Sequence, residues 1–123
     1  MKSMTILKEQ PITISVSFEI DPVGSPLQIG AYRGVKFAVV VTTVLAMSDL
    51  TPVIEVFSPT TGLWEVALVG AAITVPGGVT LTVHPDLTPS ATEASAAIAD
   101  RFRLSFRVTG AGGRAAAGLT MLA

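Results

Sequence analysis

Cysteine is missing from this chain of 123 residues, and histidine, tryptophan and tyrosine occur only once each. Without cysteine, neither a disulfide framework nor a thiolate metal site can form. A single histidine also leaves no group of imidazoles that would hold zinc. We therefore expect no cofactor and no metal. The lack of cysteine leaves undetermined whether the protein works in a reducing or an oxidising compartment.

Charge is scarce as well, because Asp, Glu, Lys and Arg make up 14% of the residues and the net charge is −1. So weak a field attracts neither nucleic acid nor anionic lipid, and we expect no nucleic acid and no membrane as partner. Half of the residues are nevertheless apolar. Large exposed apolar patches mark contact sites, so we expect burial against other chains of an assembly. The alternative is that much of the surplus is alanine, which fits anywhere.

The chain also lacks an apolar run long enough to cross a membrane as a helix, which needs about 20 predominantly apolar residues. Its longest uncharged interval, Val66–Pro85, is interrupted by Gly70, by Pro76 and by the two glycines that follow. The first ten residues have no apolar core of signal-peptide length. We expect a protein made and used in a cytoplasm, or in something assembled there.

What the sequence does contain is a series of β-forming runs separated by turn residues. The run Ile12–Ile20 alternates apolar and polar residues, which is typical of a strand with one wet face. The run Val35–Leu45 is apolar on both faces, which indicates a central strand whose second face meets a loop, an arm or another subunit. Further strands are expected at 53–57, 63–69, 71–75, 79–83, 101–109 and 114–123, with 71–75 and 79–83 forming a hairpin.

These runs predict an all-β fold, a small antiparallel β-sandwich or a β-tulip or barrel of about seven to eight strands. At most one short helix is expected, because Ser90-Ala91-Thr92-Glu93 matches a capping box before an alanine-rich stretch that ends at Asp100. Residues 1–11 are expected to be an extended N-terminal arm, and residues 12–123 a single β domain. The expected core anchors are Phe18, Phe37, Trp64, Phe102 and Phe106.

No set of residues points to an enzyme. His84 lies between a strand end and a proline, and the Gly-x-Ser-x-Gly elbow of serine hydrolases is missing. His84 and Asp86 are too few ligands for a zinc site. Gly110-Ala111-Gly112-Gly113 follows a strand without the spacing of a nucleotide-binding loop, so we interpret it as a hairpin turn.

A row of arginines on one face of the strand 101–109 allows three interpretations. Arg101, Arg103 and Arg107 would contact phosphates, although no aromatic positions alternate with them as on a single-strand platform. They would instead pair with glutamates on the outward faces of neighbouring strands, of which the candidates are Glu19, Glu55 and Glu65. The third interpretation is pairing with acidic groups of a partner protein.

Three segments carry a resemblance to a known family. Tyr32–Val35 is an arginine–glycine step into an apolar strand, and Thr60–Val66 is a hairpin with a threonine/glycine turn and a tryptophan. Arg101–Leu104 and Arg107–Gly110 belong to a strand of the type arginine–hydrophobe–arginine. In these features the chain resembles the small virion structural proteins of tailed bacteriophages, and among them the head decoration (cement) proteins. The alanine-rich segment 89–100 is not part of that pattern.

The resemblance implies a non-enzymatic protein that forms a homo-oligomer, a trimer, on the exterior of a capsid assembled in the host cytoplasm. It would clamp neighbouring subunits of the major capsid protein, partly with its N-terminal arm. The candidate contact residues are Ile6, Leu7, Pro11, Arg101, Arg103, Arg107, Leu119 and Met121. The alternatives are a tail, baseplate or head–tail component, a carbohydrate-binding module that uses Trp64 or Tyr32, and a hydrolase.

Overall fold

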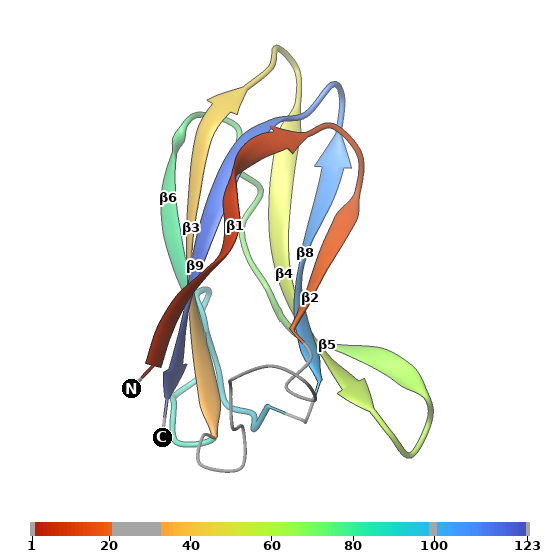
Figure 1. Cartoon of the computed structure of the whole chain (residues 1–123), viewed down its shortest axis with the longest axis vertical. Coiled ribbons are helices and arrows are strands. Elements are labelled where there is room, and N and C mark those ends of the chain that lie inside the picture. Colours follow the sequence, from red (N-terminus) through yellow and green to blue (C-terminus); the bar gives the residue numbers. More distant parts are fainter. Residues whose placement is uncertain (1, 21–32, 99–100, 123) are drawn as a thin grey trace.

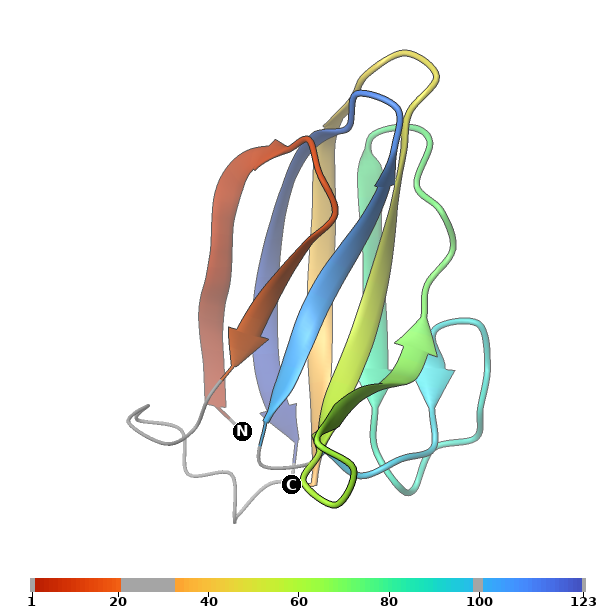
Figure 2. The ribbon, with the colours of Figure 1, turned by 90° about the vertical axis from the view of Figure 1, so that its right-hand side faces the viewer.

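The chain folds into two stacked β-sheets in the computed structural model, which describes residues 2–20, 33–98 and 101–122. Figure 1 shows the two sheets side by side, and Figure 2 shows them after a quarter turn. The described residues form nine strands and no helix. The prediction of a small antiparallel β-sandwich is therefore confirmed.

One sheet has five strands in the order β1-β9-β3-β6-β7, and the other has four in the order β2-β8-β4-β5. The five-stranded sheet consists of β1 (Lys2–Ile12), β9 (Gly113–Leu122), β3 (Gly34–Val44), β6 (Gly77–Val83) and β7 (Glu93–Ala94). The four-stranded sheet consists of β2 (Val16–Ile20), β8 (Phe102–Thr109), β4 (Asp49–Ser58) and β5 (Leu63–Val69). Neighbouring strands are antiparallel, except that β6 and β7 are parallel.

Aromatic rings pack edge to face in the core, once between the two sheets and once within the four-stranded sheet. Phe37 of β3 and Phe102 of β8 are fully buried, and their rings meet edge to face with centroids 6.2 Å apart. Phe106 is also buried, and Phe18 packs against it edge to face at the rim of the core, with centroids 6.3 Å apart. Each such pair adds about 0.5–1.5 kcal/mol beyond the burial of its area.

The fifth predicted anchor, Trp64, lies on the outer face of the four-stranded sheet, so that prediction is wrong. The pairing of β5 with β4 shifts by one residue at Ala67, which forms a β-bulge. A bulge reverses the alternation of side chains beyond it. Leu68 therefore points into the core, whereas Trp64 and Val66 point outward, although the sequence pattern places all three on one face.

The predicted N-terminal arm is a strand of the domain. β1 pairs with β9 from Lys2 to Ile12, with two register shifts on the way, so this segment forms one edge of the five-stranded sheet. Leu7 and Ile12 are almost completely buried in the core. The segment is extended, as expected, because it completes a sheet and not because it is free.

The predicted strand Ile12–Ile20 is interrupted at a corner between the sheets. β1 ends at Ile12 and β2 begins at Val16 in the other sheet. Ile14, at the corner, is 72% exposed, although the alternation of the sequence places it on the buried face. The apolar pattern continues through the corner, so the sequence gives no sign of it.

The predicted helix before Asp100 is also wrong over the described residues, because the chain there pairs alongside β6. The Thr82 amide donates to the Thr92 carbonyl at 2.9 Å, and the His84 amide donates to the Ala94 carbonyl at 3.1 Å. Residues 99 and 100 lie outside the described residues. An isolated helix of about ten residues is marginal, and the backbone bonds to β6 replace it.

The predicted hairpin of 71–75 with 79–83 does not form either. Ile73 makes an isolated bridge with Leu50, whereas β6 pairs with β3 on the other sheet. The segment that follows β5 is therefore a connection between the two sheets.

Candidate functional site

The only histidine lies in a turn at the end of β6. Its Nδ1 accepts a hydrogen bond from the amide of Asp86 at 3.1 Å and lies 3.9 Å from the Asp86 carboxylate, which Arg33 approaches at 3.5 Å. Nowhere in residues 2–20, 33–98 and 101–122 do three or more His, Asp or Glu side chains gather closely enough to hold a metal ion. No helix within those ranges is long and apolar enough to cross a membrane.

The arginine row lies on the outer face of the four-stranded sheet, and two of its members pair within the chain. Arg101 forms an ion pair with Glu19 of β2, and Arg103 donates through Nε to Glu55 of β4 at 3.1 Å. The interpretation as cross-strand pairing therefore holds for these two arginines. Arg107 is exposed and forms no ion pair with any described residue.

Glu55 is the most shielded carboxylate of this face, with 14% of its side chain exposed. Its Oε1 accepts a hydrogen bond from the Ser105 hydroxyl at 2.6 Å, and Ser17 lies 2.8 Å from the same hydroxyl. Burial raises the pKa of Glu55, but the bonds from Ser105 and Arg103 and the charges of Arg103 and Arg107 outweigh burial and lower that pKa below its ordinary value. A general acid or base needs a pKa near neutrality, so the shift suits a structural anion.

Trp64 is held on the same face by an aromatic ring and an arginine. Its ring meets Phe57 edge to face at 5.4 Å, and the guanidinium carbon of Arg103 lies 4.2 Å from its centroid. Because Arg103 covers one face of the indole, a sugar would have to displace a cation–π contact in order to stack there. Tyr32, the other residue considered for carbohydrate binding, lies outside the described residues.

Half of the residues predicted to contact a neighbour belong to the chain's own core or its margin: Ile6, Leu7, Leu119 and Met121. Leu7, Leu119 and Met121 are at most 3% exposed, because they lie on the inner face of strands of the sheet rather than on an arm and a weak final strand, whereas Ile6 is partly buried. Among the other predicted contacts, Pro11 and Arg107 remain exposed.

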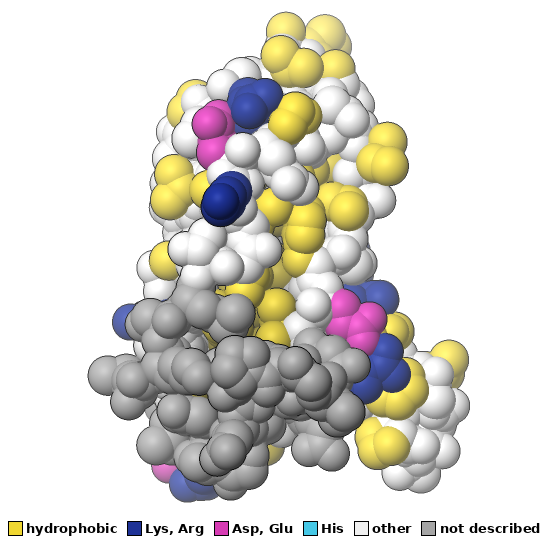
Figure 3. Space-filling view, viewed as in Figure 1, with side chains coloured by type: hydrophobic (Ala, Val, Ile, Leu, Met, Phe, Trp, Pro, Cys, Tyr) yellow, Lys and Arg dark blue, Asp and Glu magenta, His cyan; other side chains and the backbone are white. Residues whose placement is uncertain are grey.

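Exposed apolar side chains gather at one end of the sandwich, which we call the apolar end. Ile14 is 72% exposed, Met47 100% and Val75 68%, and Leu45 beside them is 45% exposed. They lie in the strand connections at the top of Figure 1, and hydrophobic side chains are visible over the same end in Figure 3. The connections 13–15, 45–48, 70–76 and 110–112 contain no Asp, Glu, Lys or Arg.

The apolar end is braced by a buried hydroxyl. Met47 has a φ of 59°, which is uncommon for a residue with a side chain and carries a conformational cost. The Oγ of Ser48 accepts hydrogen bonds from the amides of Ala111 at 2.8 Å and Gly112 at 3.1 Å. The Leu45 amide in turn donates to the Gly112 carbonyl at 2.9 Å. These bonds tie the β3–β4 and β8–β9 connections together and keep the Met47 side chain exposed to solvent.

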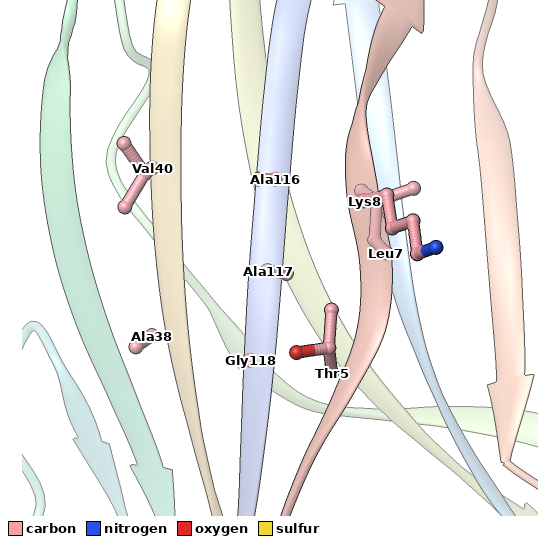
Figure 4. Close-up of a pocket in the computed structure, with 8 residues that line it drawn as sticks. All are labelled: Thr5, Leu7, Lys8, Ala38, Val40, Ala116, Ala117 and Gly118. Carbon is pink, nitrogen blue, oxygen red and sulfur yellow. The ribbon is translucent and has the colours of Figure 1, made fainter.

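A second apolar feature is a hollow of about 320 Å³ on the outer face of the five-stranded sheet. Figure 4 shows the residues that line it: Thr5, Leu7, Lys8, Ala38, Val40, Ala116, Ala117 and Gly118. The hollow exists because the side chains that β9 presents outward at this level, Ala116 and Gly118, are small and lie between β3 and β1. Val40, on its β3 side, is 47% exposed.

Sequence reasoning identified the second apolar face of the run Val35–Leu45 but missed the apolar end. The sequence feature that could have indicated the apolar end is the lack of charged residues in four connections. These connections lie far apart in the sequence, and only the fold brings them together. Compared with known proteins, the chain matches no family model, no curated protein and no solved structure at a significant level.

Proposed function

We propose that this chain is a structural protein of a virion, a head decoration (cement) protein that attaches to the capsid through its apolar end. The observation that carries the proposal is that four exposed apolar side chains lie in three charge-free connections at one end, beside a fourth connection that is also free of charge. The cores of protein interfaces are depleted in charge in the same way, and exposed apolar patches mark contact sites.

The bracing of this end supports attachment as its role. A loop that is already ordered loses little conformational entropy on binding, which favours affinity. Ser48 and its two amide partners supply that order here. The choice of a capsid as partner rests on the resemblance of the arginine–glycine step, the tryptophan hairpin and the arginine strand to small virion proteins.

The localisation is tested on particles released by cells that carry the genome encoding the chain. The particles are sedimented through a density gradient and labelled in electron microscopy with an antibody against the purified protein. We expect label over the head surface. Label confined to the tail would favour the tail or baseplate alternative and overturn the cement role, and a chain absent from the particles would overturn both.

The attachment surface is tested with the double variant Ile14→Ser, Met47→Asn, which removes the two most exposed apolar side chains. Burying each such side chain is worth about 1.5–3 kcal/mol, so particle binding should weaken at least about tenfold. The matched control is Val66→Ser, which removes an exposed apolar side chain of β5 outside the apolar end and outside the hollow, and should leave binding unchanged. Equal binding by both variants and the unmodified chain would exclude the apolar end as the attachment surface.

A further inference from the structure

The hollow on the five-stranded sheet combines an apolar lining with one cation. Ala38 and Val40 lie on its β3 side, as Figure 4 shows, and Lys8 lies on its β1 side. Lys8 is exposed and forms no ion pair with any described residue. A cavity of about 150 Å³ accepts a benzene-sized group, so a hollow of about 320 Å³ has room for at least one large aliphatic side chain.

The β4–β5 hairpin has the complementary chemistry. It projects from the body of the molecule at the lower right of Figure 1, on the side away from the five-stranded sheet. Leu63 is 65% exposed, and Glu65 is exposed without an ion pair to any described residue. The two residues are two positions apart on β5, so their side chains share one face.

The opposite face of the hairpin keeps it in place. Trp64 points to that face, where Phe57 and Arg103 pack against its ring. The hairpin therefore presents an aliphatic side chain and a carboxylate side by side from a supported position. Figure 3 shows hydrophobic side chains on this projecting part.

We propose that the β4–β5 hairpin of one copy docks into the hollow of a second copy, with Leu63 in the hollow and Glu65 against Lys8. Each surface supplies what the other lacks, since an acid with an aliphatic side chain meets a base with an apolar recess. Lys8 and Glu65 are the charges that set the register of the contact, because complementary charge gives specificity.

The two surfaces lie on different sides of the molecule, so the contact is heterologous. A heterologous contact builds a closed ring if the rotation between copies closes, and an open chain if it does not. This self-association does not depend on the proposed function. If the chain associates in this way but is absent from particles, the self-association proposal stands and the proposed virion function is wrong.

The test is sedimentation of the purified chain over a range of concentrations, with charge reversals at the two positions. We expect concentration-dependent oligomers of the unmodified chain. Lys8→Glu and Glu65→Lys each place like charges together and should lower the association constant at least about tenfold. The two changes combined in one chain should restore association, and so should an equimolar mixture of the two single variants.

The matched control is Lys36→Glu, which reverses an exposed cation on the same sheet but outside the hollow. It should leave the association constant within about twofold, as expected for an exposed charge that forms no ion pair with any described residue. Leu63→Ser provides a second probe of the docked side chain and should weaken association without changing the charge. Thermal unfolding checks that each variant is folded, which the exposure of these residues favours.

Three outcomes would overturn the proposal. The first is an unmodified chain that stays monomeric up to about 1 mM, where even a weak contact of about −4 kcal/mol would be seen. The second is single reversals that associate as well as the unmodified chain. The third is a double reversal as weak as the singles, which would mean that the hairpin binds another site or another protein.

Discussion

The apolar end and the β4–β5 hairpin both carry exposed apolar side chains beyond the body of the sandwich, but they are held in different ways. At the apolar end, a buried hydroxyl and close backbone contacts fix the loop of Met47, with no charge in the connections. On the hairpin, the ring of Phe57 and two arginines hold Trp64 from one side. The first region should be sensitive to shape and insensitive to pH, and the second should depend on charged side chains.

The largest effect is expected from Gly112→Ala at the apolar end. Gly112 has a φ of 86°, and an added Cβ would lie 2.0 Å from the Ile12 carbonyl oxygen. Neither the conformation nor the contact can be relieved without moving the β1–β2 corner. We expect a loss of about 3 kcal/mol or more in the free energy of unfolding, measured by urea denaturation.

The matched control is Gly77→Ala at the start of β6, where an added Cβ would meet nothing within 4 Å. Its effect should stay within about 0.5 kcal/mol. A Gly112 variant as stable as this control would mean that the β1–β2 corner rearranges at little cost in free energy. The apolar end would then not be rigid.

The next effect is expected from Ser48→Ala. The substitution leaves the amides of Ala111 and Gly112 without their acceptor, and a buried unsatisfied donor costs about 1–3 kcal/mol. Hydrogen exchange should accelerate at these two amides in particular. Ser58→Ala is the control, because among the described residues the Ser58 hydroxyl accepts one long bond, from the Thr61 amide at 3.5 Å. Unchanged exchange at the two amides would contradict the bracing role.

The side chains that face the core follow from the sequence, whereas those that point outward at the apolar end and on the hairpin do not. Phe37, Phe102 and Phe106 were predicted inside from period-two alternation and are buried. The alternation of apolar and polar residues shows which side chains face the core only while the strand stays in one sheet and contains no bulge. At Ile14 a corner changes the sheet, and at Ala67 a bulge changes the phase, and neither leaves a mark in the composition.

The candidate surfaces were less predictable still, because they depend on which distant segments become neighbours. The row of arginines was visible in the sequence, but its partners Glu19 and Glu55 were only candidates until the strand order was known. The hollow depends on small side chains of β9, Ala116 and Gly118, lying between β1 and β3. Alanine and glycine in a sequence do not predict an interior strand of a sheet, because both have low β propensity.

A smaller effect is expected from Trp64→Leu on the hairpin. The change removes an edge-to-face ring pair and a cation–π contact, worth about 1–2 kcal/mol together at a partly exposed site. Chemical denaturation followed by circular dichroism measures it, since the only tryptophan is lost. Leu63→Ala, on the opposite face, should change stability by less than about 0.5 kcal/mol. Equal losses in the two variants would mean that backbone pairing alone holds the hairpin.

The smallest effect, and the one that separates the two regions most cleanly, comes from pH. Burial raises the pKa of Glu55, but Ser105 and Arg103 lower it further, so the folded-state pKa lies below the unfolded value of about 4.3. The stability that Glu55 contributes is therefore complete above about pH 4.3 and is lost as the pH falls through the folded pKa. Glu55→Gln should cost about 1 kcal/mol at pH 7, and the difference from the unmodified chain should shrink below about pH 4.

Two controls complete this comparison. Glu65→Gln, at a concentration low enough to keep the chain monomeric, removes an exposed carboxylate without an ion pair to any described residue and should leave the curve unchanged. Ser48→Ala should cost the same at pH 7 and at pH 3, because the connections that Ser48 braces contain no acidic side chain. If the Ser48 difference shrank with acid as the Glu55 difference does, both regions would depend on the same carboxylates, and the distinction between a steric and an electrostatic support would fail.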